Sequence, residues 1–176
     1  MTRGPATLEQ RIARLEAVEA IKQLKASYFQ ACDDKRPDLV RECFAEGEID
    51  LDYGRIGCFD DREQLVEVFE RLACQPHIVE MHHGQNPRVE VLDEFTARGA
   101  WGLYYYLIDT RQHVITQLGG RYDDAFVLQA GQWRICRSHY VVTSSQILDW
   151  SEGLARVIFA GSSAPVELDD PGRQAG

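Results

Sequence analysis

The spacing of apolar residues changes partway along the chain from a helical to a strand period, and this change constrains the fold most strongly. Over Leu8–Cys32 apolar residues recur every three or four positions, which predicts one long helix with a single buried stripe. Thr7 and Gln10 are spaced as in a capping box at its start. Pro37 favours the first turn of a second, short helix ending near Phe44. We therefore expect a helical N-terminal region.

Extended segments are expected to dominate the rest of the chain. Glu48–Tyr53 alternates apolar and acidic residues, as half-buried strands do, and a third helix is expected from about Asp61 to Ala73. After Pro76 we expect five strands, near residues 77–83, 88–92, 96–108, 114–128 and 133–147. Helices followed by antiparallel strands define an α+β fold. We expect one domain at residues 8–160, with flexible segments at 1–7 and 161–176.

One of these strands is apolar on both faces. The run Trp101–Ile108 offers side chains of this kind in both strand parities. Helices would cover one face, and either a partner subunit or the curled interior of the sheet would cover the other. A sheet bent over the long helix would form a cone with one open mouth, which is a natural pocket for a small molecule.

The charge balance argues against several classes of partner. The chain has 28 acidic and 19 basic side chains, giving a formal net charge of −9. Such a molecule repels nucleic-acid phosphates and anionic membranes, and no apolar run reaches the roughly 20 residues needed to cross a bilayer. The N-terminus lacks the apolar stretch of a signal peptide. Five cysteines without a CxxC pair indicate reduced thiols and a cytoplasmic location.

Two segments carry candidate acid–base residues. Asp33 follows the buried stripe at the C-terminal end of the first helix, where the helix dipole disfavours a negative charge. His82 and His83 end an apolar strand, so one of them should face the interior. A carboxylate beside that histidine can hold one tautomer and make the far nitrogen a base; the alternative is a purely structural histidine. Alternation from Met81 turns His83 inward, whereas a bulge or turn before Gly84 turns His82 inward.

The last strand carries a third candidate group. Alternation places Arg137 and His139 on one face with Trp133, and a charged or polar side chain on an apolar face is costly unless paired or used. Both are candidates for an anion or leaving-group site. The alternative is a structural ion pair of Arg137 with Asp33, Asp123 or Asp124. Five tyrosines are candidates to supply hydroxyls to a pocket, namely Tyr28, Tyr53, Tyr104, Tyr105 and Tyr106.

Motifs for metals and common cofactors do not occur. The sequence has no HExxH spacing, no glycine-rich phosphate loop and no G-x-S-x-G elbow. We therefore expect neither a metal nor a cofactor.

Several short motifs occur in a fixed order. Arg14–Ile21 leads into Tyr28-x4-Asp33, and His82-x3-Asn86-Pro87 and Gly131-x-Trp133-Arg134-Ile135 follow. This order, over about Leu8 to Ser145, resembles the SnoaL-like branch of the nuclear-transport-factor-2-like (NTF2-like) superfamily. That group includes scytalone dehydratase, bile-acid 7α-dehydratase, hexachlorocyclohexane dehydrochlorinase and polyketide cyclases. The resemblance implies an α+β cone-shaped barrel with an interior pocket, and a homodimer or homotrimer.

The resemblance also implies residue roles. In the dehydratases and the dehydrochlorinase an Asp–His dyad removes a proton from carbon, and those positions fall on Asp33 and His82. The dehydratase tyrosine falls on Tyr28 and the dehydrochlorinase arginine on Arg137. Substrate contacts are expected from Tyr53, Tyr104, Tyr106, His139 and Trp133.

The function implied is a cofactor-independent lyase or isomerase acting on a small hydrophobic ring compound, such as a steroid or polyketide. The alternative is a non-catalytic ligand-binding or assembly module like the β subunit of a ring-hydroxylating dioxygenase. In that alternative Asp33 and His82 are not in contact and the interior is filled. Epoxide hydrolysis is a third possibility, for which Asp33 alone is thin support.

Overall fold

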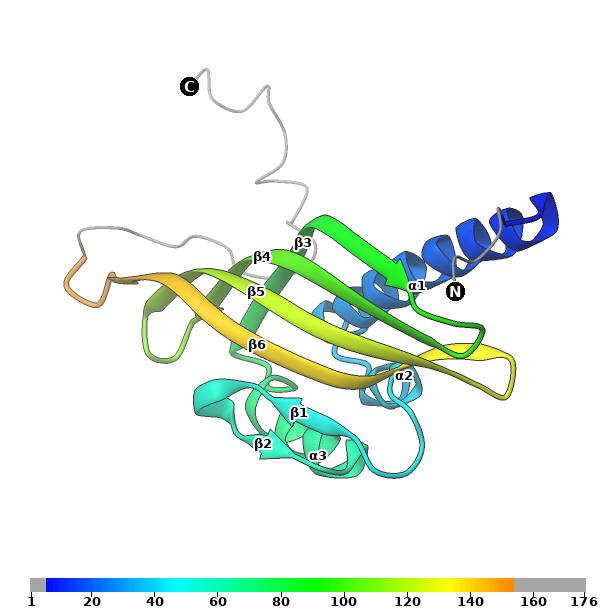
Figure 1. Ribbon diagram of the computed structural model, residues 1–176. Helices are drawn as coiled ribbons and strands as arrows, with labels where there is room; N and C mark the ends of the chain where they lie inside the picture. The colour runs from blue at the N-terminus through cyan, green and yellow to red at the C-terminus, as the bar shows by residue number, and fades with distance from the viewer. Residues whose placement is uncertain (1–5, 154–176) are drawn as a thin grey trace, which may run out of the picture.

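The computed structural model describes residues 6–153, and it confirms the expected α+β fold (Figure 1). Its helices are α1 (Leu8–Asp33), α2 (Pro37–Cys43) and α3 (Arg62–Leu72). The flexible segments expected at 1–7 and 161–176 lie, except for residues 6 and 7, outside the described residues.

Local sequence explains where the helices begin. At the start of α1 the Gln10 N–H donates to Thr7 Oγ1 at 3.2 Å, and the Thr7 N–H donates to Gln10 Oε1 at 3.0 Å, which completes the expected capping box. Pro37 occupies the first turn of α2. Asp61 caps α3 by accepting the N–H of Glu63 at 2.7 Å. All three starts lie within two residues of those expected.

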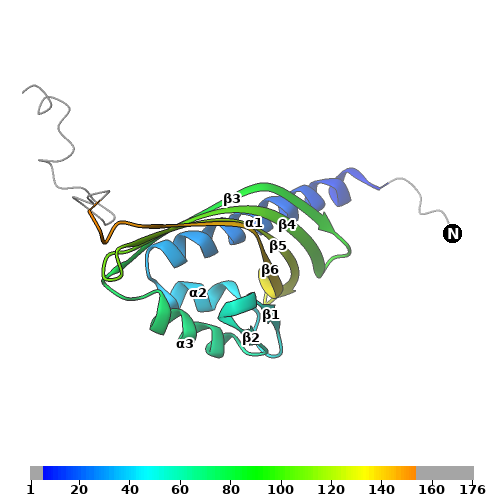
Figure 2. The same ribbon diagram turned by 90° about the vertical axis from the view of Figure 1, so that its left-hand side faces the viewer.

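Within residues 6–153, six strands form one open, curved sheet. They are β1 (Asp50–Asp52), β2 (Cys58–Phe59), β3 (Ile78–Val91), β4 (Thr96–Asp109), β5 (Val114–Gln129) and β6 (Gln132–Asp149). Their order across the sheet is β2-β1-β6-β5-β4-β3, with only the β1–β6 pair parallel. The sheet arches over the helices, which lie together on its inner side (Figure 2). A one-sided helical layer of this kind leaves room for an interior between helices and sheet.

Two strand boundaries differ from those expected. The segments 77–83 and 88–92 form a single strand, β3, whose register shifts between Gln85 and Arg88. Asn86 lies in this irregular stretch with a φ of 51°, a backbone conformation that asparagine tolerates better than most residues. The strand expected over Glu48–Tyr53 is shortened to β1, because a 3₁₀ turn at Gly54–Ile56 follows it.

Only the second half of α1 is buried. The expectation of one continuous buried stripe is wrong for its first turns, where Leu8, Ile12 and Leu15 are exposed. The reason is visible in Figures 1 and 2, where the N-terminal half of α1 extends past the sheet. From Ile21 onward the stripe enters the core.

A charged pair lies inside this core. Lys25 Nζ is 2.7 Å from Asp124 Oδ2, with side chains 1% and 0% exposed. Ser138 Oγ donates to the other carboxylate oxygen of Asp124 at 2.7 Å. Lys25 Nζ also lies 3.7 Å from the ring centroid of Tyr122, within cation–π range. Burial lowers the pKa of Lys25, and the charge of Asp124 opposes that shift.

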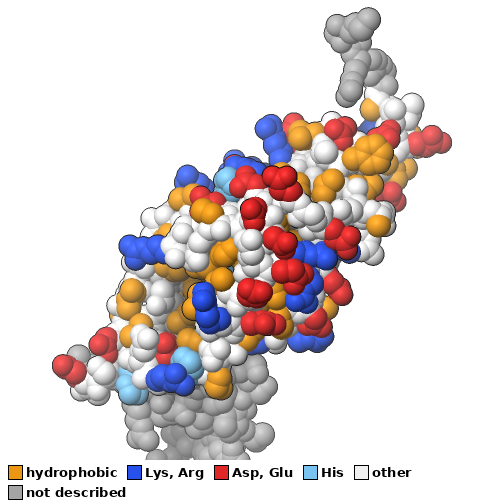
Figure 3. Space-filling view, turned by 90° about the horizontal axis from the view of Figure 1, so that it is seen from below, with side chains coloured by type: hydrophobic (Ala, Val, Ile, Leu, Met, Phe, Trp, Pro, Cys, Tyr) orange, Lys and Arg blue, Asp and Glu red, His pale blue; other side chains and the backbone are white. Residues whose placement is uncertain are grey.

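The outer surface is consistent with the acidic composition. Acidic side chains spread across the middle of the face seen from below in Figure 3. Within residues 6–153, no helix has the length and apolar character required to span a membrane.

Candidate active site

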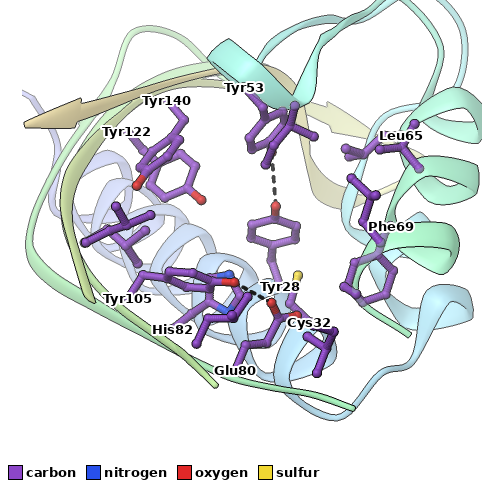
Figure 4. Close-up of a pocket in the computed structure, with 18 residues that line it drawn as sticks. Tyr28, Cys32, Tyr53, Leu65, Phe69, Glu80, His82, Tyr105, Tyr122 and Tyr140 are labelled. Atoms are coloured by element: carbon purple, nitrogen blue, oxygen red, sulfur yellow. Dashed lines mark hydrogen bonds between the residues drawn. The ribbon is translucent and has the colours of Figure 1, made fainter. Parts of the chain in front are cut away.

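A cavity of about 280 Å³ lies between the helices and the sheet (Figure 4). Its lining comes from α1, α3, the turn after β1 and strands β3 to β6, and most of it is apolar or aromatic. The groups bearing polar atoms are five tyrosines, one cysteine, one carboxylate and one imidazole: Tyr28, Tyr53, Tyr105, Tyr122, Tyr140, Cys32, Glu80 and His82. A largely apolar chamber with a few polar groups is typical of a small-molecule site.

Asp33 and His82 meet at the wall of this cavity. His82 Nδ1 lies 2.6 Å from Asp33 Oδ1. The backbone N–H of His82 donates to both carboxylate oxygens of Asp33, at 3.0 and 3.1 Å. His82 lines the cavity, and both residues also border a second, more open groove on the other side of this wall. The carboxylate is therefore anchored to the strand that carries the imidazole.

Aromatic neighbours hold the imidazole ring in place. Phe29 is stacked on the His82 ring with centroids 5.9 Å apart and planes 12° apart, and Tyr105 lies 4.8 Å away, tilted by 56°. Gly84 leaves space for Phe29, because an added Cβ there would lie 2.3 Å from Phe29 Cε2. With Nδ1–H assigned as the donor to Asp33, Nε2 keeps its lone pair for a ligand.

His82, rather than His83, faces the cavity. The inward residues of this part of β3 are Ile78, Glu80 and His82, while Met81 and His83 are exposed. The bulge or turn expected before Gly84 does not occur there, since the register shift comes later in β3. Alternation based on apolar Met81 turned His83 inward, which is wrong, because the inward position next to Met81 is held by the carboxylate of Glu80.

Two tyrosines form a hydrogen-bonded pair in the centre of the cavity. The hydroxyls of Tyr28 and Tyr53 are 3.1 Å apart (Figure 4). Tyr53 also makes a long contact of 3.4 Å with Ser138 Oγ, which connects the pair to the buried Asp124. Burial raises the pKa of both phenols, so they stay protonated and able to donate at neutral pH.

A further phenol lacks a partner. Tyr140 Oη is buried and has no hydrogen-bond partner among the described residues. The ring lies over Gly120, where an added Cβ would come 2.4 Å from Tyr140 Cε2. In Figure 4 Tyr122 and Tyr140 lie side by side at the cavity wall. A buried hydroxyl without a partner is costly, so this position favours a ligand that accepts a hydrogen bond.

One carboxylate belongs to the cavity wall. Glu80, whose side chain is 6% exposed, accepts a hydrogen bond from Tyr105 Oη at 2.7 Å and pairs with Lys35 Nζ at 2.5 Å. Lys35 does not line the cavity. It follows α1 with a φ of 56° and reaches Glu80 from outside the cavity.

Arg137 and His139 lie away from the cavity. Arg137 Nε is 3.3 Å from Asp50 Oδ2, and His139 Nε2 is 2.9 Å from the same oxygen. The expectation that they share an apolar face with Trp133 is wrong, because the register of β6 shifts at Cys136. Ile135 and Ser138 are both buried as a result. Of the three carboxylates considered for a structural ion pair with Arg137, Asp123 makes one: its Oδ1 lies 3.4 Å from Arg137 Nη1.

Of the other residues expected to contact substrate, one lines the cavity and three do not. Tyr53 lines the cavity, whereas Tyr104, Tyr106 and Trp133 do not. Tyr104 is 39% exposed and Trp133 packs against the core. In β4 the inward parity contains Tyr105 instead, between Leu103 and Leu107. Because three consecutive tyrosines occupy both parities, the sequence carries no signal that separates them.

Four of the cavity residues with polar side-chain atoms were not singled out from the sequence. Tyr122, Tyr140 and Glu80 lie in strands, and only their alternation with known inward residues could have identified them. Cys32 ends the buried stripe of α1, and burial raises its pKa. Within the described part of the chain, no cluster of three His, Cys, Asp or Glu side chains is positioned to bind a metal ion.

Comparison with known proteins identifies the family to which this chain belongs. Residues 13–139 match the model of the SnoaL-like domain, so the chain belongs to the SnoaL-like family. The expected membership of this branch of the NTF2-like superfamily is confirmed.

Solved structures share the fold at low sequence identity. A provisionally assigned scytalone dehydratase from Novosphingobium aromaticivorans is 20% identical, with a TM-score of 0.71 over 77% of this chain and 90% of that chain. Hexachlorocyclohexane dehydrochlorinase type 3 from Novosphingobium barchaimii is 15% identical, with a TM-score of 0.72 over 84% and 98%. A provisionally assigned aromatic ring hydroxylase from N. aromaticivorans is 19% identical, with a TM-score of 0.67 over 76% and 93%. At these identities the likeness shows the fold alone.

Proposed function

We propose that this protein is a cofactor-independent lyase that removes a carbon-bound proton from a small hydrophobic ring compound, with His82 as the general base. The observation that carries this proposal is the 2.6 Å contact of His82 with Asp33, at the wall of a mostly apolar cavity. The dehydratase and dehydrochlorinase names among the structural neighbours agree with this reaction class.

In the proposed reaction Asp33 orients His82 and stabilises the imidazolium that forms. Nε2 takes a proton from a ring carbon, and the electron pair of that C–H bond becomes the new C=C bond. The bond to a leaving group on the neighbouring carbon breaks, and a departing hydroxide takes the proton from the His82 imidazolium to become water, which restores the neutral base. The Tyr28–Tyr53 pair and the free Tyr140 hydroxyl donate hydrogen bonds to the developing negative charge.

Arg137 is not part of this mechanism. Its expected role was to stabilise a leaving group, and its side chain lies outside the cavity beside Asp50. The phenols inside the cavity replace it as donors. An isomerase reaction uses the same first step, with the proton returned to a different carbon instead of loss of a leaving group.

The assembly-module alternative rests on different expectations. It expects a filled interior and no contact between Asp33 and His82, whereas the interior holds a cavity and the two side chains are hydrogen-bonded. No observation in the described residues favours it over the lyase.

The test is a panel of hydroxylated and halogenated ring compounds, with product formation followed by mass spectrometry. For a substrate that responds, His82→Gln should slow turnover about 10²- to 10⁴-fold, the usual worth of a positioned acid–base group. His83→Gln is the matched control, because His83 is the exposed neighbour on the same strand and should leave the rate unchanged. A His82→Gln variant as fast as the wild type would remove the base from the proposal.

A further inference from the structure

The carboxylate of Glu80 is an unusual component of the cavity wall. It is the one acidic side chain among the described residues that line the cavity, and its surroundings are apolar and aromatic. A buried carboxylate is costly unless its charge is paired and its oxygens accept hydrogen bonds. The two contacts of Glu80 meet that requirement only in part.

The donors around Glu80 leave acceptor capacity unused. Lys35 binds Oε1 and Tyr105 binds Oε2, and these are the two donors to this carboxylate among the described residues. A carboxylate has about four acceptor positions, so about two stay free. Glu80 lines the cavity and Lys35 does not, so a ligand in the cavity comes closer to Glu80 than to the ammonium group of Lys35.

Neighbouring groups stay neutral at this end of the cavity. Burial first, and the negative charge of Glu80 second, raise the pKa of Tyr105 and of Cys32. Tyr105 therefore remains a donor to Glu80, and neither Tyr105 nor Cys32 adds a negative charge beside it. The local field favours a hydrogen-bond donor and opposes an anion.

The strand sets the distance between Glu80 and the proposed base. Glu80 and His82 are two residues apart on the same face of β3, which corresponds to roughly 6–7 Å along the strand. That spacing is about the width of one ring. A cavity of about 150 Å³ holds one benzene ring, so 280 Å³ has room for two fused rings.

We propose that Glu80 is a specificity-determining subsite that accepts a hydrogen bond from a hydroxyl group of the ligand, so that the cavity selects neutral hydroxylated ring compounds and rejects carboxylates. This rests on the proposed function only in taking the cavity as the ligand site. The selected hydroxyl lies about one ring away from the carbon that faces His82, and it is not the group that leaves.

Binding of two probes tests the proposal without any turnover. At pH 7, 2-naphthol is neutral and donates a hydrogen bond, whereas 2-naphthoate has the same rings and is an anion. Isothermal titration calorimetry on the wild type should show 2-naphthol binding at least 10-fold more tightly. Glu80→Gln should weaken 2-naphthol and strengthen 2-naphthoate by about 5- to 10-fold each, because a hydrogen bond to a charged acceptor is the stronger one and the repelling charge is gone.

Matched variants separate this role from a structural one. Asp34→Asn removes one negative charge at the C-terminal end of α1, next to Lys35 but outside the cavity. It should leave the ratio of the two dissociation constants unchanged. Glu80→Gln/Lys35→Met removes both partners of the ion pair and should show the same reversal if the single variant is poorly folded.

Three results would overturn the subsite. They are a wild type that fails to bind 2-naphthol, a wild type that binds both probes equally, and a Glu80→Gln variant that changes both affinities by the same factor. Absence of lyase activity with intact probe selectivity would contradict the proposed reaction and leave the subsite standing.

Discussion

Replacing Lys25 with methionine removes the positive member of the buried ion pair while keeping most of the apolar volume of the side chain. The Asp124 carboxylate, 0% exposed, would then retain only the hydrogen bond from Ser138. Breaking a buried pair by removing one partner typically costs about 3–5 kcal/mol. Lys25 also contacts the face of the Tyr122 ring, so we expect the upper part of that range.

This loss is large against the total stability of a domain. Folded domains have unfolding free energies of about 5–15 kcal/mol, and each kcal/mol changes Tm by about 2–4 °C at this chain length. Lys25→Met should therefore lower Tm by roughly 8–20 °C. Urea denaturation followed by circular dichroism measures the free energy directly.

Two further variants make the reasoning refutable. Lys25→Met/Asp124→Asn removes the unpaired charge and should recover at least about 2 kcal/mol relative to the sum of the single changes. Lys22→Met, one turn earlier on α1, should cost less than about 1 kcal/mol because Lys22 is only half-buried. A Lys25→Met variant within 1 kcal/mol of the wild type, or a double variant with fully additive loss, contradicts the account.

Three more outcomes follow from burial and close packing. Burial raises the pKa of Cys43 from 9.0 to about 11, so the unfolded state ionises first and stability is lost as pH rises from 9 to 11. Between pH 8 and pH 10.5 the unfolding free energy of the wild type, measured by urea denaturation, should fall by about 2 kcal/mol more than that of Cys43→Ala. The same pH dependence for both proteins would contradict this. Gly84→Ala should push Phe29 off the His82 ring and cost about 1–3 kcal/mol in the same assay, with no loss if Phe29 can rotate freely. Gly120→Ala should cost a similar amount, and a background of Tyr140→Ala should make it nearly neutral in a double-mutant cycle.

Local patterns were enough to place most elements of this fold. The helix starts depend on neighbouring residues, such as Thr7 with Gln10, and the long strands on period-two alternation. Local patterns also singled out Asp33, but alternation pointed to His83, and it was the resemblance to SnoaL-like proteins that selected His82, which lies beside Asp33. Their meeting itself depends on how β3 packs beside the end of α1, which no local pattern encodes.

Side-chain direction in the strands was the weak point. Alternation placed Arg137 on the apolar face of its strand, but the register shift at Cys136 turns it away. Tyr104 was expected to contact substrate, but Tyr105 lines the cavity instead, and a run of three tyrosines gives no pattern that tells them apart. Glu80 was missed because a carboxylate facing an apolar interior contradicts the usual pattern. Lys25 was missed for the same reason, although its place on the buried stripe of α1 was a readable signal.

The second half of α1 links the stability of the core to the geometry of the proposed site. Lys25 and Asp33 are eight residues apart on one continuous helix, a rise of about 12 Å at 1.5 Å per residue. Inserting or deleting one residue between them would rotate Asp33 by about 100° relative to Lys25, so the two cannot be adjusted independently. Length variation in this helix is therefore confined to the exposed turns before Ile21, and in homologues we expect the interval 25–33 to keep its length even where its residues change.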